Sequence, residues 1–83
     1  MPLYHFKVRT PSHVLITDVV ELADSTTARV EAARRIGALL KDHAGQLWVD
    51  QDWQMEIANA DGLILYAIQV SALQAAAAPT NRN

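Results

Sequence analysis

The fold is decided by residues 53–70, which read WQMEIANADGLILYAIQV. Large apolar residues alternate with other residues in the first part of this stretch, which is typical of a strand with one buried face; they are Trp53, Met55 and Ile57. The next four residues, 59–62, end in Asp61-Gly62, a pair that tolerates positive φ and favours a tight hairpin turn. Residues 63–70 are mostly apolar and predict the returning strand. A turn of two or four residues places three of its side chains on the same face as the first set: Tyr66, Ile68 and Val70.

A second hairpin is predicted near the N-terminus. Residues 3–10 alternate between core-type and cationic side chains, which predicts a half-buried strand; the core set is Tyr4, Phe6 and Val8, and the cationic set is His5, Lys7 and Arg9. Pro11-Ser12 interrupts this pattern, as a turn does. Residues 13–22 are rich in β-branched residues and predict the partner strand, in which Asp18 marks a bulge or a break.

A helix is predicted between the hairpins, at residues 25–44. Asp24 and Ser25 suit its start, because their side-chain oxygens accept hydrogen bonds from the free N–H groups of the first turn. Small and apolar residues then recur at helical spacing and predict one buried face: Ala28, Ala32, Ile36, Leu39, Leu40 and His43. Gly45 predicts a left-handed stop just beyond the helix. Gly37 costs about 1 kcal/mol relative to alanine inside a helix, which predicts a close approach to a neighbouring element there.

Together these elements predict an α+β fold of the β-β-α-β-β kind, a four-stranded antiparallel sheet with one amphipathic helix packed on one face. The strand order 2-1-3-4 keeps all neighbouring strands antiparallel and gives a right-handed crossover. Residues 46–52 are predicted to connect the helix to the third strand. We expect one domain, residues 1–73, followed by a disordered C-terminal tail, residues 74–83.

The composition limits what can support so small a domain. The chain has 83 residues, and domains of this size are often stabilised by disulfides, a metal or a partner subunit. It contains no cysteine, which excludes disulfides and cysteine-based zinc sites. No apolar run suits a signal peptide or a membrane span, so we expect a cytoplasmic protein without a membrane partner.

The helix-free face of the sheet carries the main functional prediction. Four apolar residues are predicted to point away from the helix: Leu3, Leu63, Leu65 and Ala67. A strand that is apolar on both faces is usually covered on both, and one helix covers only one. We therefore expect this face, or the edge of the fourth strand, to meet another chain, most simply a second copy in a homodimer. The alternatives are a tail that folds back over Leu63 and Leu65, or a small patch that stays exposed.

The charge argues against nucleic acid as the main partner. Seven basic and nine acidic residues give a net charge of −2, whereas nucleic-acid binders usually show a basic excess or stripe. The strand face formed by His5, Lys7 and Arg9 could still meet phosphates. Single-strand binders interleave exposed aromatic residues with such a stripe, and here the aromatic residues of that strand are predicted to face the core. Pairing with Glu56 across the sheet is the structural interpretation of these cations, and Trp48 has no predicted place.

The histidines do not predict a metal site. A hydrolytic zinc site needs three convergent ligands, and His5, His13 and Asp18 lack any metal-binding spacing. His5 and His13 are interpreted as polar residues on a solvated face. His43 is predicted near the helix C-terminus, where a cation interacts well with the last carbonyl groups.

No nucleophile or cofactor motif is predicted either. Ser12, Ser25 and Ser71 lack the glycine-rich elbow of hydrolases. Asp50 and Asp52 are interpreted as residues of a solvated loop. The three glycines are too far apart for a phosphate cradle. We therefore expect no catalytic residues, no cofactor and no enzymatic activity.

The N-terminal residues show a family resemblance. They are similar to the opening of short bacterial proteins that begin Met-Pro-x-Tyr-x-Phe, and here they read Met1-Pro2-Leu3-Tyr4-His5-Phe6-Lys7-Val8-Arg9. The similarity continues through residues 21–24, the Ala/Arg-rich helix and Asp61-Gly62, and it covers about residues 1–73. The family is classified as a domain of unknown function, so the resemblance implies a compact β-β-α-β-β unit and assigns no site residues. One departure is the turn after the first strand. Family members tend to have an acidic, glycine-containing turn there, and this chain has Thr-Pro-Ser-His at residues 10–13.

These patterns favour a small non-enzymatic interaction module that self-associates or binds another protein. The apolar fourth strand and the lack of a catalytic motif are the observations behind this expectation. The alternative is a nucleic-acid-associated accessory protein that uses the His5, Lys7 and Arg9 face.

Overall fold

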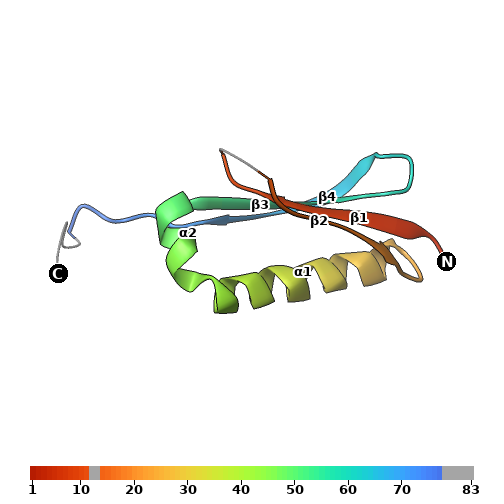
Figure 1. The fold of residues 1–83 in the computed structure, drawn as a ribbon, viewed down its shortest axis with the longest axis horizontal. Helices are drawn as coiled ribbons and strands as arrows, with labels where there is room; N and C mark the ends of the chain where they lie inside the picture. Colours follow the sequence, from red (N-terminus) through yellow and green to blue (C-terminus); the bar gives the residue numbers. More distant parts are fainter. Residues whose placement is uncertain (12–13, 78–83) are drawn as a thin grey trace.

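A computed structural model describes residues 1–11 and 14–77. The elements follow in the order β1 (Leu3–Arg9), β2 (Val14–Glu21), α1 (Ser25–Asp42), α2 (Ala44–Asp50), β3 (Asp52–Ala58) and β4 (Ile64–Ser71). In Figure 1, α1 lies along one side of the sheet, and α2 lies at the end where β3 begins. The predicted β-β-α-β-β architecture is confirmed. The predictions for Ser12, His13 and residues 78–83 lie outside the described residues.

All neighbouring strands are antiparallel, and their order is β2-β1-β3-β4, as predicted. The C-terminal hairpin has the predicted alignment, because Trp53 lies opposite Val70 and Met55 lies opposite Ile68. The central strands β1 and β3 are therefore far apart in the sequence but lie side by side in the sheet. Strands β2 and β4 form the two edges of the sheet.

The core lies between the central strands and α1. Its buried members are Tyr4, Phe6, Val8, Ala28, Ala32, Ile36, Trp53, Met55 and Ile57. Full burial of a large apolar side chain contributes roughly 1.5–3 kcal/mol, so β1 and β3 supply most of the stabilisation. The predicted core residues of β4 are only half-buried: Tyr66, Ile68 and Val70.

Helix α1 begins as predicted. The side chain of Asp24 accepts a hydrogen bond from the backbone N–H of Thr27 at 2.7 Å. This bond satisfies one of the free donors of the first turn. Because it favours the ionised carboxylate, it lowers the pKa of Asp24.

The C-terminal end of α1 differs from the prediction. The helix ends at Asp42, and the backbone N–H of His43 closes it by donating to the Leu39 carbonyl. A second helix, α2, starts directly at Ala44, so Gly45 lies inside a helix and is no left-handed stop. The left-handed residue is Gln51, with φ 69°, at the end of α2. The segment predicted as a connection is thus largely helical, because Leu47 packs against the core and holds it there.

Two further predictions about α1 are wrong. Gly37 is exposed, and a side chain added there would meet no atom within 4 Å. It therefore makes no close approach to a neighbouring element. His43 is exposed instead of lying on the buried face, because the chain changes direction at this residue between the two helices.

The β3–β4 turn is closed by its first residue. The side-chain oxygen of Asn59 accepts hydrogen bonds from the N–H groups of Asp61 and Leu63, both at 3.0 Å. Gly62 has φ 87° and donates its N–H to the Asn59 carbonyl. The predicted role of Asp61-Gly62 in a tight turn is confirmed, because glycine adopts this left-handed conformation without steric cost.

The sheet contains two register irregularities. One lies between Val8 and Arg9, which are opposite Ile16 and Val14. The break in β2 therefore occurs before Asp18, which is itself part of the regular strand.

No helix in residues 1–11 or 14–77 is long and apolar enough to cross a membrane.

Candidate functional site

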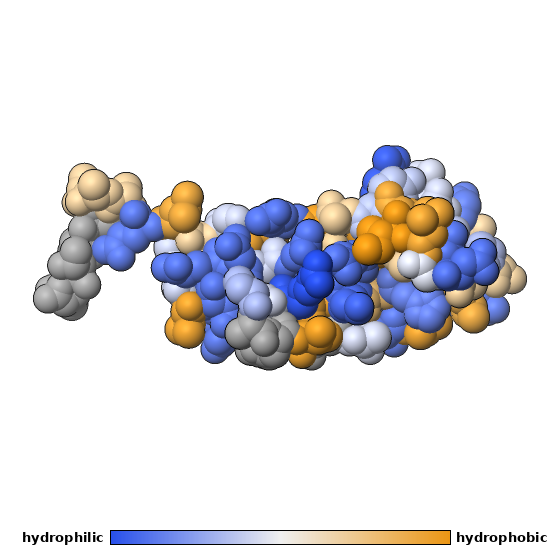
Figure 2. All heavy atoms as spheres, turned by 90° about the horizontal axis from the view of Figure 1, so that it is seen from above, coloured by the Kyte–Doolittle hydropathy of each residue, from blue (hydrophilic) through white to orange (hydrophobic). Residues whose placement is uncertain are grey.

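The face of the sheet opposite α1 is called the open face, because no element of residues 1–11 or 14–77 packs on it. Figure 2 shows this face from above, with hydrophilic residues across its middle and a hydrophobic cluster at the end that carries the β3–β4 turn. Strand register explains the pattern. The row at the apolar end runs across the sheet through Val19, His5, Ala58 and Ile64.

The polar part of the open face is held together by Arg9. Its guanidinium contacts the Glu56 carboxylate at 2.7 Å and donates to Gln54 Oε1 at 3.2 and 3.3 Å. The predicted cross-sheet pairing with Glu56 is therefore confirmed for Arg9. Lys7 lies directly opposite Glu56 in the register and is exposed.

The cationic residues of β1 share the open face but sit in different surroundings. His5 is half-buried between Val19 and Ala58. With Lys7, Glu56 and neighbouring residues it lines a shallow hollow on the open face. His5, Lys7 and Arg9 therefore do not form one uniform basic stripe: the first lies in an apolar row, the second is exposed and the third is paired with an acid.

The residues considered as metal ligands, His5 and Asp18, lie on opposite faces of the sheet. His5 is on the open face, whereas Asp18 is opposite Phe6 and so lies on the helix side of the sheet. His13 lies outside the described residues. Across the part of the chain that the structure describes, no group of three His, Cys, Asp or Glu residues could hold a metal ion.

The other candidate side chains take part in local structure. Asp50 accepts hydrogen bonds from the indole N–H of Trp53 at 2.9 Å and from Gln46 Nε2 at 3.0 Å. Asp52 accepts one from the Ser71 hydroxyl at 2.7 Å, which ties the start of β3 to the end of β4. The two carboxylates thus belong to α2 and β3 and not to the solvated loop that the sequence predicted.

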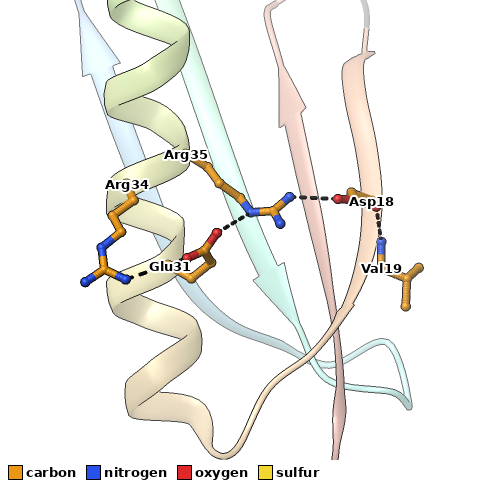
Figure 3. A network of polar contacts seen from close by, with 5 residues as sticks. All are labelled: Asp18, Val19, Glu31, Arg34 and Arg35. Atoms are coloured by element: carbon orange, nitrogen blue, oxygen red, sulfur yellow. Dashed lines mark hydrogen bonds and ion pairs between the residues drawn. The ribbon is translucent and has the colours of Figure 1, made fainter.

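A polar network that the sequence did not predict links β2 to α1 (Figure 3). Arg35 donates from Nη1 to Asp18 Oδ2 at 2.7 Å and from Nε to Glu31 Oε2 at 3.0 Å. Its guanidinium also lies 5.0 Å from the centre of the Phe6 ring. The network therefore covers the core on the β2 side with charge.

The network also shifts the ionisation of its members. Hydrogen bonds from Arg35 and from the Val19 N–H lower the pKa of Asp18. The hydrogen bond to Asp18 raises the pKa of Arg35. Alternation along β2 alone could have placed Asp18 on the helix side, but only the crossing position of α1 brings Arg35 to it.

Strand β4 departs from the predicted side-chain pattern at one residue. Ile57 lies opposite Tyr66 and Ala58 lies opposite Ile64, so Leu65 is an extra residue, a β-bulge. Leu65 therefore packs against the core and does not point away from the helix as predicted. Ile64 takes its place on the open face and is 53% exposed.

The remaining residues of the predicted association surface are solvent-exposed. Ala67 is opposite Glu56, and Leu3 is opposite Glu21, which puts both on the open face. Leu63 is 63% exposed beside the turn. Two more exposed apolar residues flank the opposite end of the sheet: Trp48 on α2, and Leu73, which is 84% exposed just after β4.

β4 is the last strand in the sheet order, so no other strand within residues 1–11 and 14–77 pairs with its outer edge. The N–H of Ala72 donates to the Gln51 carbonyl and so points toward β3. Backbone groups alternate between the two sides of a strand. The N–H and C=O groups of Ser71, Gln69 and Ala67 therefore point outward.

Comparison with known proteins supports the resemblance seen at the N-terminus. A profile described as Domain of unknown function (DUF6894) matches residues 3–71. No curated protein and no solved structure shows significant similarity to the chain. Since the matched segment runs from the first residue of β1 to the last residue of β4, it contains the whole sheet and both helices. The chain belongs to the DUF6894 family of domains of unknown function.

Proposed function

We propose that this chain is a small, non-enzymatic protein-interaction module that works by self-association, with β4 as the contact. The observation that carries the proposal is the composition of this outer strand. All eight residues of β4, ILYAIQVS, are uncharged, and none is proline. Natural proteins usually protect an exposed edge strand with charged residues, proline, a β-bulge or a covering element. Beyond the bulge at Leu65, β4 has no charged residue, proline or further bulge and is suited to pairing with another chain.

Burial supports the same conclusion from the side chains. Tyr66, Ile68 and Val70 face the helix side but are only half-buried, whereas the equivalent residues of β1 and β3 are fully buried. On the other face, Ile64 and Ala67 are exposed. A second subunit next to β4 would add apolar contacts on both faces, at roughly 25 cal/mol for each Å² removed from water.

The size of the domain gives self-association a clear benefit. Chains near this length bury a modest fraction of their surface and are marginally stable alone. Without cysteine, the chain cannot add a disulfide. Pairing two copies through β4 would extend the sheet and the core together, and a twofold contact between identical surfaces is the commonest form of oligomer.

Sedimentation equilibrium over a wide range of protein concentration tests the proposal. We expect a reversible dimer for the unaltered chain. Ala67→Lys places a cation on β4 and should shift the protein to monomer. Thr17→Lys is the matched control, because Thr17 is an exposed open-face residue on the other edge strand and should leave the dimer intact. An unaltered chain that stays monomeric at the highest concentrations would overturn the proposal.

A further inference from the structure

We infer that β4 pairs antiparallel with β4 of a second copy about a twofold axis at Gln69, which makes one continuous sheet from the two four-stranded sheets. The inference rests on the proposed self-association and specifies its register. It adds what the proposal leaves open, namely which backbone groups bond and which side chains meet. The helices α1 of both copies then lie on the same side of the joined sheet.

The backbone supplies the first argument. Beyond the bulge, the outward-pointing residues of β4 are Ala67, Gln69 and Ser71, and this set is symmetric about Gln69. In an antiparallel ladder, outward residues pair with each other and exchange both of their hydrogen bonds. A twofold axis at Gln69 pairs it with its own copy and pairs Ala67 with Ser71 of the second copy. Every outward residue of the set then has a partner.

The β-bulge selects this register over its neighbour. If the twofold axis moved by one residue, to Ile68, Ala67 would pair with Gln69 of the second copy and Ser71 would lie opposite Leu65. Leu65 is the extra residue of the bulge, where the ladder is locally disrupted. The register centred on Gln69 uses only the regular part of the strand, residues 66–71.

Side chains that are incompletely covered meet in this register. On the helix side, Ile68 lies opposite Val70 of the second copy, and both are half-buried in one chain. Beyond the end of the strand, Leu73 reaches the level of Leu65 of the second copy, next to its Ile64. The pairing thus brings the 84% exposed Leu73 toward the apolar end of the other open face.

Charge explains why β4 pairs with β4 of the second copy and not with β2. Strand β2 carries Asp18 and Glu21, whereas β4 carries no charge. A contact between β4 and β2 would also be heterologous, and unless its rotation closed, it would produce open-ended chains. The contact between two β4 strands closes after two copies.

Disulfide formation between introduced cysteines tests the register directly, because the chain contains no cysteine that could compete. Paired residues of an antiparallel ladder have Cα atoms about 5.5 Å apart, which is within the range for a disulfide, roughly 4.4–6.8 Å. We expect Gln69→Cys to form a covalent dimer under mild oxidation. Ala67→Cys and Ser71→Cys should each stay monomeric in denaturing gels, because each residue lies about 13 Å from its own copy. An equimolar mixture of these two variants should form a mixed disulfide.

Thr17→Cys on β2 is the control for random collision, and it should form no covalent dimer. All four positions are exposed, so the substitutions leave the core unchanged. If the protein is a dimer in sedimentation but Gln69→Cys does not cross-link, or Ala67→Cys cross-links with itself, the register is wrong and the proposed function stands. If the protein is a monomer throughout, both fail.

Discussion

The two edges of the sheet are built in opposite ways. The β2 edge carries Asp18 and Glu21. Its Asp18 accepts a hydrogen bond from Arg35 of α1 (Figure 3). The guanidinium of Arg35 also lies over the Phe6 ring. The β4 edge has no charge and no ion pair to a helix among the described residues. One edge is thus protected by charge, and the other is left open along an uncharged strand.

This difference shows how a four-stranded sheet is covered when α1 is the main helix packed on it. A single helix covers the two central strands completely and the outer strands only in part. At β2 the gap is filled by the charged side chain of Arg35, which needs no further cover. At β4 the covering contacts are Arg29, 5.3 Å from the centre of the Tyr66 ring, and Leu65 at the bulge. These leave the middle of β4 half-buried, and we propose that a second copy completes its burial.

The largest expected effect removes part of the core between the two edges. Phe6 of the central strand β1 is 1% exposed and lies under Arg35. Phe6→Ala should lower the free energy of unfolding by about 3–5 kcal/mol, through lost burial and the cavity left behind. Chemical denaturation measures it, and Val30→Ala at an exposed site of α1 is the control, with a change near zero. Equal losses for the two variants would contradict the assigned core.

The next effect separates the two sides of β4. Val70 points its N–H toward β3, so Val70→Pro removes a hydrogen bond of the hairpin and should strongly destabilise the fold. Gln69 points its N–H outward, so Gln69→Pro should keep the monomer folded and weaken the proposed dimer. Two intermolecular hydrogen bonds are lost per dimer, which raises the dissociation constant roughly tenfold or more. Circular dichroism and sedimentation distinguish the two outcomes. Similar unfolding by both variants would show that the β4 backbone is not oriented as described.

The sequence predicted the central part of this comparison well. Alternation in residues 3–10 and 53–58 identified both central strands and their buried faces, because a side-chain period of two directly reflects which face is buried. The Asp61-Gly62 turn fixed the C-terminal hairpin. With two hairpins and one helix, antiparallel pairing and a right-handed crossover left the observed strand order as the simplest arrangement.

The details of the edges could not be predicted in the same way. An alternating pattern carries no mark of a bulge, so Leu65 was expected on the face that Ile64 occupies. The bond between Asp18 and Arg35 depends on where α1 crosses the sheet, which is a tertiary property. Helix α2 was missed because its seven residues are too few for a periodic pattern, and contacts of Leu47 with the core stabilise it.

A smaller effect sharpens the comparison by changing stability without touching either edge. Gly37 is exposed inside α1, and an added methyl group meets no atom within 4 Å. Gly37→Ala should therefore raise the free energy of unfolding by about 1 kcal/mol. The dissociation constant of the dimer should stay the same, since the site is on the outward side of the helix. Gly62→Ala is the matched opposite, because φ of 87° strains any other residue, and it should lower stability. If Gly37→Ala changed association, the contact would have to include α1.

The smallest effect concerns the charged edge and depends on pH. Because the pKa of Asp18 is lowered in the folded protein, its ion pair stabilises the fold above the ordinary aspartate pKa, and this stabilisation is lost as pH falls through the lowered value. Asp18→Asn should thus be slightly less stable than the unaltered chain at pH 7, and the difference should vanish in acid. Since both side chains of the pair are partly exposed, salt should also reduce the difference. Denaturation of both proteins at pH 7 and below pH 3 measures this. A difference that persists unchanged in acid would mean that Asp18 acts through packing or neutral hydrogen bonds. The charge of Asp18 would then contribute nothing to stability at the β2 edge.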